Sequence, residues 1–239
     1  MSHCLWCGDF VTSNLTWSNV FRLDVDHGFC EWCERQLEPL DAAQSLCRQC
    51  GRDLSQLPET FHEKGVCQDC LRWEASDWKG VLDNNRSLYH YNEFLRDVMA
   101  RYKFRGDALL SEAFRTPFRR AFRRYFKNFC VVPIPLSKER MFERCFNQSE
   151  RLAALTGGTV VSALERPLHT EKQSKRTRSE RLAIQRPFQL VDKATSGVIG
   201  KHILLVDDIY TTGTTLRQAA AAVREAQPNK VCALTLARG

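Results

Sequence analysis

The chain has 239 residues, 43% of them hydrophobic, and a formal net charge of +7. This length and composition predict one or two globular domains with a buried core. No run approaches the roughly eighteen apolar residues of a membrane-spanning helix, and the first ten residues lack the apolar segment of a signal peptide. We therefore expect a cytoplasmic protein without membrane insertion.

Charge is unevenly distributed along the chain. Residues 1–75 contain 6 Lys and Arg against 12 Asp and Glu, whereas residues 76–239 contain 29 against 16. We predict a cysteine-rich, zinc-binding module over 1–75 and a second domain over 76–239. The positive charge of the second domain favours polyanionic partners such as nucleic acid.

Eight of the eleven cysteines form four Cys-x-x-Cys pairs: Cys4/Cys7, Cys30/Cys33, Cys47/Cys50 and Cys67/Cys70. In a cytosolic chain this spacing favours zinc over disulfides, and four thiolates complete one tetrahedral site. We expect two structural zinc ions, with redox-active dithiols as the alternative. Sequential pairing is preferred because each half reads CxxCG followed by CxxC, although an interleaved pairing stays open.

Two helices are expected at the start of the second domain. Apolar residues recur at helical spacing from Tyr91 to Tyr102, and four phenylalanines follow every fourth position from Phe114 to Phe126. The second helix is expected to restart with Thr116 as its N-cap and Pro117 in its first turn, and its phenylalanine stripe favours core packing over base stacking. Basic residues with little acidic compensation surround this stripe and form either a solvated surface or a nucleic-acid contact. They are Arg119, Arg120, Arg123, Arg124 and Lys127.

A strand is predicted over 129–134, followed by a proline-containing loop and a helix beginning near Asn147. Loops at the carboxyl ends of parallel strands hold ligands, so Arg140 and Arg144 in this loop are expected to bind anionic oxygen atoms. A short strand over 159–164 comes next. Residues 166–186 include seven Lys and Arg with little apolar periodicity, which favours a lid over a charged ligand; a surface linker is the alternative.

The stretch ILLVDDIYTTGTTLR at 203–217 carries the most information. Its first four residues predict a strand buried on both faces of a parallel sheet. Asp207 and Asp208 are expected to end that strand, and Thr214 to cap a helix that runs to about residue 225. A last strand is predicted over 231–236.

The loop after this strand is suited to a phosphate. A helix N-terminus attracts anions, and Gly213 allows a close approach of the backbone. The loop also offers threonine hydroxyls as donors, at Thr211, Thr212, Thr214 and Thr215. The acid pair can accept hydrogen bonds from two ribose hydroxyls, directly or through a divalent metal, although an isolated pair can equally cap a turn. The absence of GxxxxGK[ST] argues against a nucleotide triphosphatase.

The order of elements from 203 to 217 matches the signature of type I phosphoribosyltransferases, which bind phosphoribosyl pyrophosphate (PRPP). Over nearly the whole chain, the order of motifs resembles the ComF family of competence-associated phosphoribosyltransferase-like proteins. The motifs are the Cys-x-x-Cys repeats, YKFRG, VVPIPLSKER with FNQ, RPLHTEKQSKRTRSER and ILLVDDIYTTGTT. This resemblance implies an α/β fold, with a mostly parallel sheet and flanking helices, preceded by a zinc-ribbon-like module.

The resemblance also implies roles for particular residues. Asp207 and Asp208 would bind the ribose and Mg²⁺ and form the catalytic pair, residues 211–215 would bind the 5′-phosphate, and Arg140 and Arg144 the pyrophosphate. The implied function is PRPP binding and DNA uptake during natural transformation, where single-stranded DNA enters the cytoplasm; related members use external DNA as a nutrient.

Two departures from the family pattern concern the ligand loops. The family usually has glycine where Cys145 precedes the FNQ motif. Thr211 stands where purine-specific transferases place aspartate, so purine salvage is poorly supported. Three functions stay open: a PRPP-binding protein that associates with single-stranded DNA, an active transferase with an unidentified acceptor, and a scaffold that joins a DNA-uptake helicase or channel protein.

Overall fold

A four-stranded parallel sheet forms the centre of the protein. The computed structural model describes residues 2–11, 28–42, 45–104, 107–167 and 187–239. Across the sheet the strands follow the order β5 (Asn84–His90), β10 (Lys230–Arg238), β9 (His202–Tyr210) and β6 (Cys130–Pro133). The predicted α/β class with a parallel sheet is confirmed.

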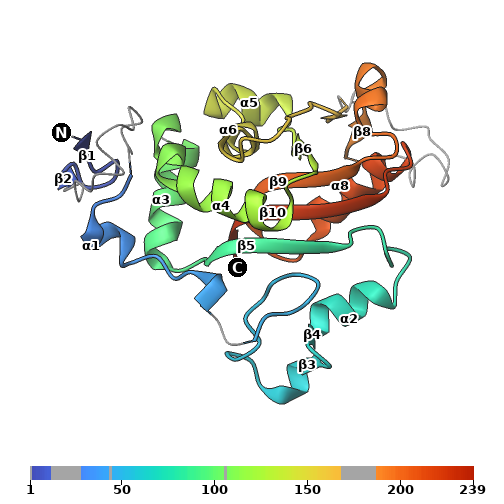
Figure 1. Cartoon of the computed structure of the whole chain (residues 1–239), viewed down its shortest axis with the longest axis horizontal. Helices are drawn as coiled ribbons and strands as arrows, with labels where there is room; N and C mark the ends of the chain where they lie inside the picture. The colour runs from blue at the N-terminus through green and yellow to red at the C-terminus, as the bar shows by residue number, and fades with distance from the viewer. Residues whose placement is uncertain (1, 12–27, 43–44, 105–106, 168–186) are drawn as a thin grey trace, which may run out of the picture.

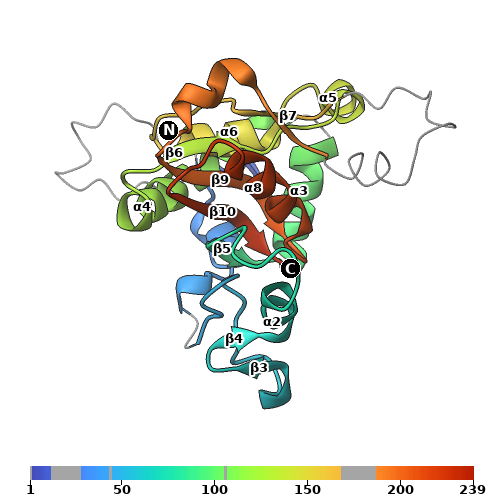
Figure 2. The same cartoon turned by 90° about the vertical axis from the view of Figure 1, so that its right-hand side faces the viewer.

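Helices cover both faces of this sheet (Figures 1 and 2). On one face lie α3 (Glu93–Phe104), α4 (Arg115–Tyr125) and α6 (Gln148–Leu155), and on the other lies α8 (Thr214–Arg224). Along β9, Leu204 and Val206 pack toward the first group, whereas Ile203 and Leu205 pack toward α8. Both faces of the strand are therefore apolar, as a central parallel strand requires.

Shorter elements complete the described chain. They are β1 (Ser2–His3), β2 (Phe10–Val11), α1 (Glu31–Glu34), β3 (His62–Glu63), β4 (Val66–Cys67), α2 (Gln68–Glu74), α5 (Lys138–Arg144), β7 (Leu164–Glu165) and β8 (Gln189–Leu190). Segments of 3-10 helix span Leu40–Ala42, Glu59–Phe61, Ala108–Phe114 and Asp192–Gly197. Within the described ranges, no helix combines the length and the hydropathy needed to cross a bilayer.

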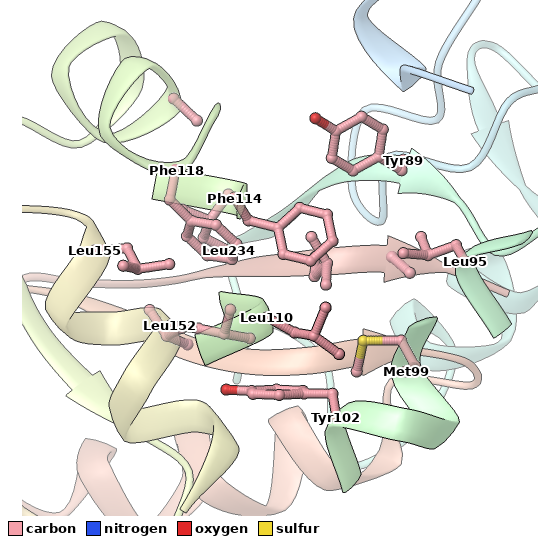
Figure 3. Close-up of a cluster of buried hydrophobic side chains, with 14 of the residues drawn as sticks. Tyr89, Leu95, Met99, Tyr102, Leu110, Phe114, Phe118, Leu152, Leu155 and Leu234 are labelled. Carbon is pink, nitrogen blue, oxygen red and sulfur yellow. The ribbon is translucent and has the colours of Figure 1, made fainter. Parts of the chain in front are cut away.

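The phenylalanine stripe packs in the core, as predicted. Its four rings are at most 6% exposed, and Figure 3 shows Phe114 and Phe118 in one cluster with Leu152 and Leu155 of α6 and Leu234 of β10. Because the rings occupy the inner face of α4, the arginines of this helix point outward. The N-cap of α4 is Phe114, two residues before the predicted cap Thr116, because the helix directly follows the preceding 3-10 segment.

Two expected boundaries at the end of β9 are wrong. The strand does not end at the acid pair but continues to Tyr210, because β10 pairs with it as far as Arg238. The N-cap of α8 is Gly213, with φ of +83°, and Thr214 is the first helical residue. Asp207 and Asp208 therefore lie within a strand, where hydrogen bonds to β10 hold their backbone.

The predicted loop after β6 contains a helix. Ser137 caps α5, since its Oγ accepts a hydrogen bond of 3.3 Å from the backbone N–H of Arg140. At the other end of α5, Cys145 adopts a left-handed conformation with φ of +62°. The strand expected over 159–164 is reduced to a parallel bridge between Val160 and Val131 and to the two residues of β7.

The backbone at Cys145 yields a stability prediction. A left-handed conformation costs a side chain with a Cβ about 1–2 kcal/mol, partly offset by the lower chain entropy of a non-glycine residue in the unfolded state. We expect Cys145→Gly to raise the free energy of unfolding by about 0.5–1 kcal/mol in chemical denaturation. Cys145→Ala retains the Cβ and serves as the control. Equal stabilities of the glycine and alanine variants would contradict this explanation.

Candidate functional site

The acid pair lies near the carboxyl end of β9, the edge at which parallel sheets bind ligands. Asp207 Oδ1 accepts hydrogen bonds from Ser149 Oγ and from the backbone N–H of Asp208, both at 2.9 Å. Asp208 Oδ2 lies 2.6 Å from Lys103 Nζ, at the end of α3. Burial and the neighbouring Asp208 carboxylate raise the pKa of Asp207 to about 7. The pair therefore holds less than its full negative charge until a cation or hydroxyl donors arrive.

The segment after β6 places the groups around Asp207. Asn147 caps α6 by accepting a hydrogen bond of 3.0 Å from the backbone N–H of Ser149, and its Nδ2 donates to Ile134 O at 3.1 Å. Gln148 Oε1 accepts a hydrogen bond of 3.1 Å from Arg144 Nη1. These contacts bring the Ser149 hydroxyl to Asp207 and orient Arg144, so the FNQ motif connects the strand end to the site.

The loop between β9 and α8 requires glycine at one position. A Cβ on Gly213 would lie 2.2 Å from the Tyr210 hydroxyl and 2.3 Å from Arg217 Nη1, so no other residue fits. The hydroxyls of Thr212 and Thr214 lie 2.9 Å apart. The first turn of α8 contains no acidic residue, and its N–H groups have no acceptors within the helix. This combination is suited to a phosphate group.

Two buried arginines contact Tyr210 at the start of this loop. Arg217 Nη1 donates to the Tyr210 hydroxyl at 2.8 Å, and its guanidinium lies 4.5 Å from the ring centroid of Trp73. Arg238 Nη1 donates to Tyr210 O at 3.3 Å, and its Nη2 lies 3.9 Å from Cys50 Sγ. Trp73 Nε1 donates to Thr212 O at 3.0 Å. A continuous array of contacts thus joins Cys50 to the candidate phosphate loop.

Three arginines lie on the side of α5. Arg140 and Arg144 are on this helix and not on the predicted loop. Arg166 donates from Nε to Pro135 O at 3.1 Å and lies over the Phe188 ring. Burial and the charge of Arg140 lower the pKa of Arg166, and the Asp207 carboxylate opposes that shift. Arg166 therefore shares the field of Arg140 and Asp207. The rest of the predicted lid, residues 168–186, lies outside the described residues.

The cysteines form the two groups of the sequential arrangement: Cys4, Cys7, Cys30 and Cys33, and Cys47, Cys50, Cys67 and Cys70. Within each group all four Sγ atoms lie within 4.8 Å of one another, and all eight cysteines are free thiols. The Sγ atoms of Cys7 and Cys30, and of Cys50 and Cys67, are 3.6 Å apart. Bonds of 2.3 Å to one central zinc would place such atoms about 3.8 Å apart, so both donor sets fit this ion.

The two cysteine groups contact different parts of the sheet domain (Figures 1 and 2). The first lies beside α3, where Phe29 packs edge-to-face against Phe94 at 5.9 Å between ring centroids. Arg101 of the same helix donates to Trp6 O at 3.0 Å. The second lies below β5, where Asn85 Nδ2 donates to Cys50 O at 3.0 Å. Each group is therefore anchored on the domain that carries the acid pair.

The structure does not bring every predicted residue to one place. The predicted nucleic-acid contacts lie away from the acid pair. Arg119 and Arg123 of α4, with Lys127 just after this helix, line a cavity that also includes Lys201, directly before the first residue of β9. Conversely, sequence reasoning missed several residues that the site uses: Lys103, Ser149, Trp73, Tyr210, Arg217 and Arg238. Lys103 lies within YKFRG and Ser149 directly follows FNQ, so these motifs were the available signal.

Residues 153–239 match the family model described as "Phosphoribosyl transferase domain". A solved structure described as "Structure of the allosteric regulatory enzyme of purine biosynthesis" aligns with a TM-score of 0.38 and 19% identity, over 53% of this chain and 26% of that chain.

Three characterised relatives match most of the chain. "Competence protein ComFC" of Bacillus subtilis (strain 168) is 37% identical over 232 residues, which cover 93% of this chain and 88% of the relative. "Competence protein ComFC" of Streptococcus pneumoniae (strain ATCC BAA-255 / R6) is 34% identical, covering 98% and 99%. "DNA utilization protein YhgH" of Escherichia coli (strain K12) is 27% identical, covering 88% and 94%. The chain therefore belongs to the ComF family of competence proteins, with a phosphoribosyltransferase-like domain.

Proposed function

We propose that the protein binds PRPP at the carboxyl edge of its sheet and associates with single-stranded DNA during DNA uptake for natural transformation. The observation that carries this proposal is the grouping of three kinds of charged or polar group at one edge of the sheet. A carboxylate pair, an acid-free helix start and several guanidinium groups lie there, which together match a ribose, a 5′-phosphate and a pyrophosphate. The competence role is supported by the relatives at 34–37% identity.

The ligand would contact three parts of this edge. Its ribose hydroxyls donate to Asp207 and Asp208, and its 5′-phosphate accepts from the N–H groups and hydroxyls of residues 211–215. Pyrophosphate oxygens accept from Arg140 and Arg144 on α5. Carboxylate oxygens are the ligands that Mg²⁺ prefers, so the acid pair fits the Mg²⁺ that accompanies PRPP, which supplies charge neutralisation at the pyrophosphate.

Lys103 connects the free protein to the proposed bound form. Its ammonium group lies 2.6 Å from Asp208 Oδ2, so a ligand that takes this carboxylate competes with the ion pair. The side chains of Lys103 and Asp208 are largely buried, at 17% and 14% exposure. A displaced ammonium group would therefore stay inside the site, close to the ligand's negative groups. Lys103 would therefore neutralise Asp208 before binding and the pyrophosphate afterwards.

The nucleic-acid part of the proposal is supported by α4. Its predicted contact residues are exposed, with their charges directed away from the core. We further propose that two structural zinc ions occupy the two cysteine groups. Free thiolate ligands of this kind persist in a reducing compartment, which supports a cytoplasmic location.

A second candidate function is phosphoribosyl transfer to an acceptor. It is favoured by the complete set of acid pair, phosphate loop and arginines, since these groups also stabilise a departing pyrophosphate. The acceptor attacks the anomeric carbon while the bond to pyrophosphate breaks, and Arg140 and Arg166 lie on the side where negative charge accumulates. Release of pyrophosphate in the presence of candidate acceptors distinguishes turnover from binding alone.

Asp207→Asn separates ligand binding from folding. An amide oxygen can still accept the hydrogen bonds from Ser149 and from the Asp208 N–H, but the negative charge is lost. We expect calorimetric titration with PRPP and Mg²⁺ to show saturable binding to the wild type and at least tenfold weaker binding to the variant, about 1.4 kcal/mol.

The same substitution is expected to increase stability. The pKa of Asp207 is raised from 3.8 to about 7 in the folded protein. Ionisation of this carboxyl therefore lowers the free energy of unfolding of the wild type as the pH rises from about 4 to 7. Asp207→Asn should therefore be more stable by about 1–3 kcal/mol at pH 8, and the difference should shrink toward pH 5. Full PRPP affinity in the stable variant would refute the assigned site.

Metal content tests the two zinc ions separately. Elemental analysis of the purified wild type should give about two zinc per chain, and Cys7→Ser and Cys50→Ser should each give about one, because each variant lacks a thiolate of a different four-thiolate site. Loss of both ions in either variant would contradict two independent sites.

A further inference from the structure

The cations of α4 lie on two sides of the helix. Arg119 and Arg123 are four residues apart and line a cavity of about 510 Å³ together with Lys127 and Lys201. Arg120 and Arg124 line a different cavity, of about 600 Å³, on the other side. The five residues predicted as one nucleic-acid face therefore belong to two surfaces, which have different neighbours.

Acidic residues distinguish these two cavities. The lining of the larger one includes Glu34, Asp41 and Glu112 beside its three arginines, of which Arg86 is the third. The lining of the smaller one contains four cations and no acid. Within the described part of the chain, these four cations form no ion pair with a carboxylate. We name the smaller cavity the basic pocket; its positive potential is uncompensated by the residues that surround it.

The basic pocket is separate from the PRPP edge. Its lining includes Cys130, the first residue of β6, and Lys201, directly before β9. Asp207 lies six residues further along the chain, which corresponds to about 20 Å of extended strand. The two anion-attracting regions thus occupy opposite ends of the parallel sheet, and a ligand at one end leaves the other accessible.

The pocket also offers aromatic surface. Phe122 and Phe129 contribute to its wall, and the exposed His202 packs against Phe129 with 5.2 Å between ring centroids. Gly158 permits this shape, because a Cβ there would lie 2.5 Å from the Phe122 ring. Cations that contact phosphates, combined with rings that contact bases, are typical of single-strand binding surfaces.

We propose that the basic pocket binds the sugar-phosphate backbone of single-stranded nucleic acid through Arg119, Arg123, Lys127 and Lys201, with one unpaired base entering toward Phe129. This inference rests on the proposed association with single-stranded DNA and assigns it to one surface. A volume of about 510 Å³ accommodates a small organic group. The bases of a duplex stay stacked inside the helix and cannot enter the pocket, whereas an unpaired strand can place a base there.

Two variants with equal charge loss test the assignment. Arg119→Gln, Arg123→Gln and Lys201→Gln remove three cations from the basic pocket. Arg86→Gln, Arg120→Gln and Arg124→Gln remove three from the larger cavity and control for the change in overall charge. Fluorescence anisotropy of a labelled oligothymidylate, measured over a series of salt concentrations, gives the affinity and the number of phosphate contacts.

We expect the pocket variant to bind the oligonucleotide at least tenfold more weakly at low salt. Its log–log salt slope should fall by about 2, because each lost contact to a single strand removes about 0.7. The control should keep most of the wild-type slope. Calorimetry with PRPP and Mg²⁺ should give equal affinities for the pocket variant and the wild type, which shows that the variant is folded.

Each other outcome overturns part of the account in a recognisable way. Equal slopes for both variants would remove the assignment to the basic pocket while single-strand binding remains. Absence of oligonucleotide binding by the wild type would remove both proposals. Inorganic phosphate that competes with the oligonucleotide at equal phosphate concentration would identify a site for small anions instead, since a strand gains affinity from several contacts at once.

Discussion

The packing of Tyr210 between two buried arginines is the interaction on which the candidate PRPP site depends. Tyr210 is 2% exposed and ends β9 at the start of the phosphate loop. Arg217 binds its hydroxyl, and Arg238 binds its carbonyl and covers its ring at 4.8 Å. Gly213 has to be glycine because its missing Cβ leaves room for this tyrosine hydroxyl and for Arg217. The shape of the loop thus depends on Tyr210 and Arg217, which lie within the 203–217 signature, and on Arg238, which lies outside it.

Buried positive charge requires compensation, and the site contains two arginines of this kind. Arg217 and Arg238 are 4% and 5% exposed, and neither forms an ion pair with a carboxylate among the described residues. A zinc ion with four thiolates carries a net charge of −2, so the second cysteine group would compensate Arg238 through Cys50. A bound phosphate would compensate Arg217. A structural metal and a ligand would then stabilise the same buried pair of charges, each through a different arginine.

The two halves of the chain are consequently interdependent at this site. Trp73 of α2 contacts both Thr212 and Arg217, so the cysteine-rich part supplies a piece of the phosphate loop's support. The first cysteine group shares the cluster that contains Phe114 and Leu234. The boundary near residue 75, which composition predicts, stays a prediction. These contacts show which residues would lose their neighbours if the chain were cut there.

Local sequence signals were sufficient for the parts of the fold that local chemistry determines. The apolar run of 203–206, the phenylalanine stripe of α4 and the sequential cysteine groups were all predicted from spacing. The length of β9 was not, because pairing with β10 decides it. Helix α5 and strand β5 were not predicted either. Helix α5 lacks an apolar stripe, and β5 reads NNRSLYH, a polar strand at the edge of the sheet.

The missed site residues have the same explanation. Lys103 reaches Asp208, and Trp73 reaches Thr212, across separations of 105 and 139 residues. The YKFRG motif marks the segment that contains Lys103, but neither periodicity nor motif spacing identifies the partner in such a contact, since the contact arises only when the helices and the sheet pack together. The phosphate signature predicts which segment would bind the ligand, and this stays a prediction, whereas the support of that segment became visible only in three dimensions.

Hydrogen exchange of the backbone amides at 210–217 tests the central claim most directly. Cys50→Ser and Cys7→Ser each remove one thiolate, from the second and the first cysteine group respectively. If the second group supports the phosphate loop through Arg238 and Tyr210, exchange of these amides should accelerate in Cys50→Ser and keep the wild-type rate in Cys7→Ser. Unchanged exchange in Cys50→Ser, or equal acceleration in both variants, would contradict the account.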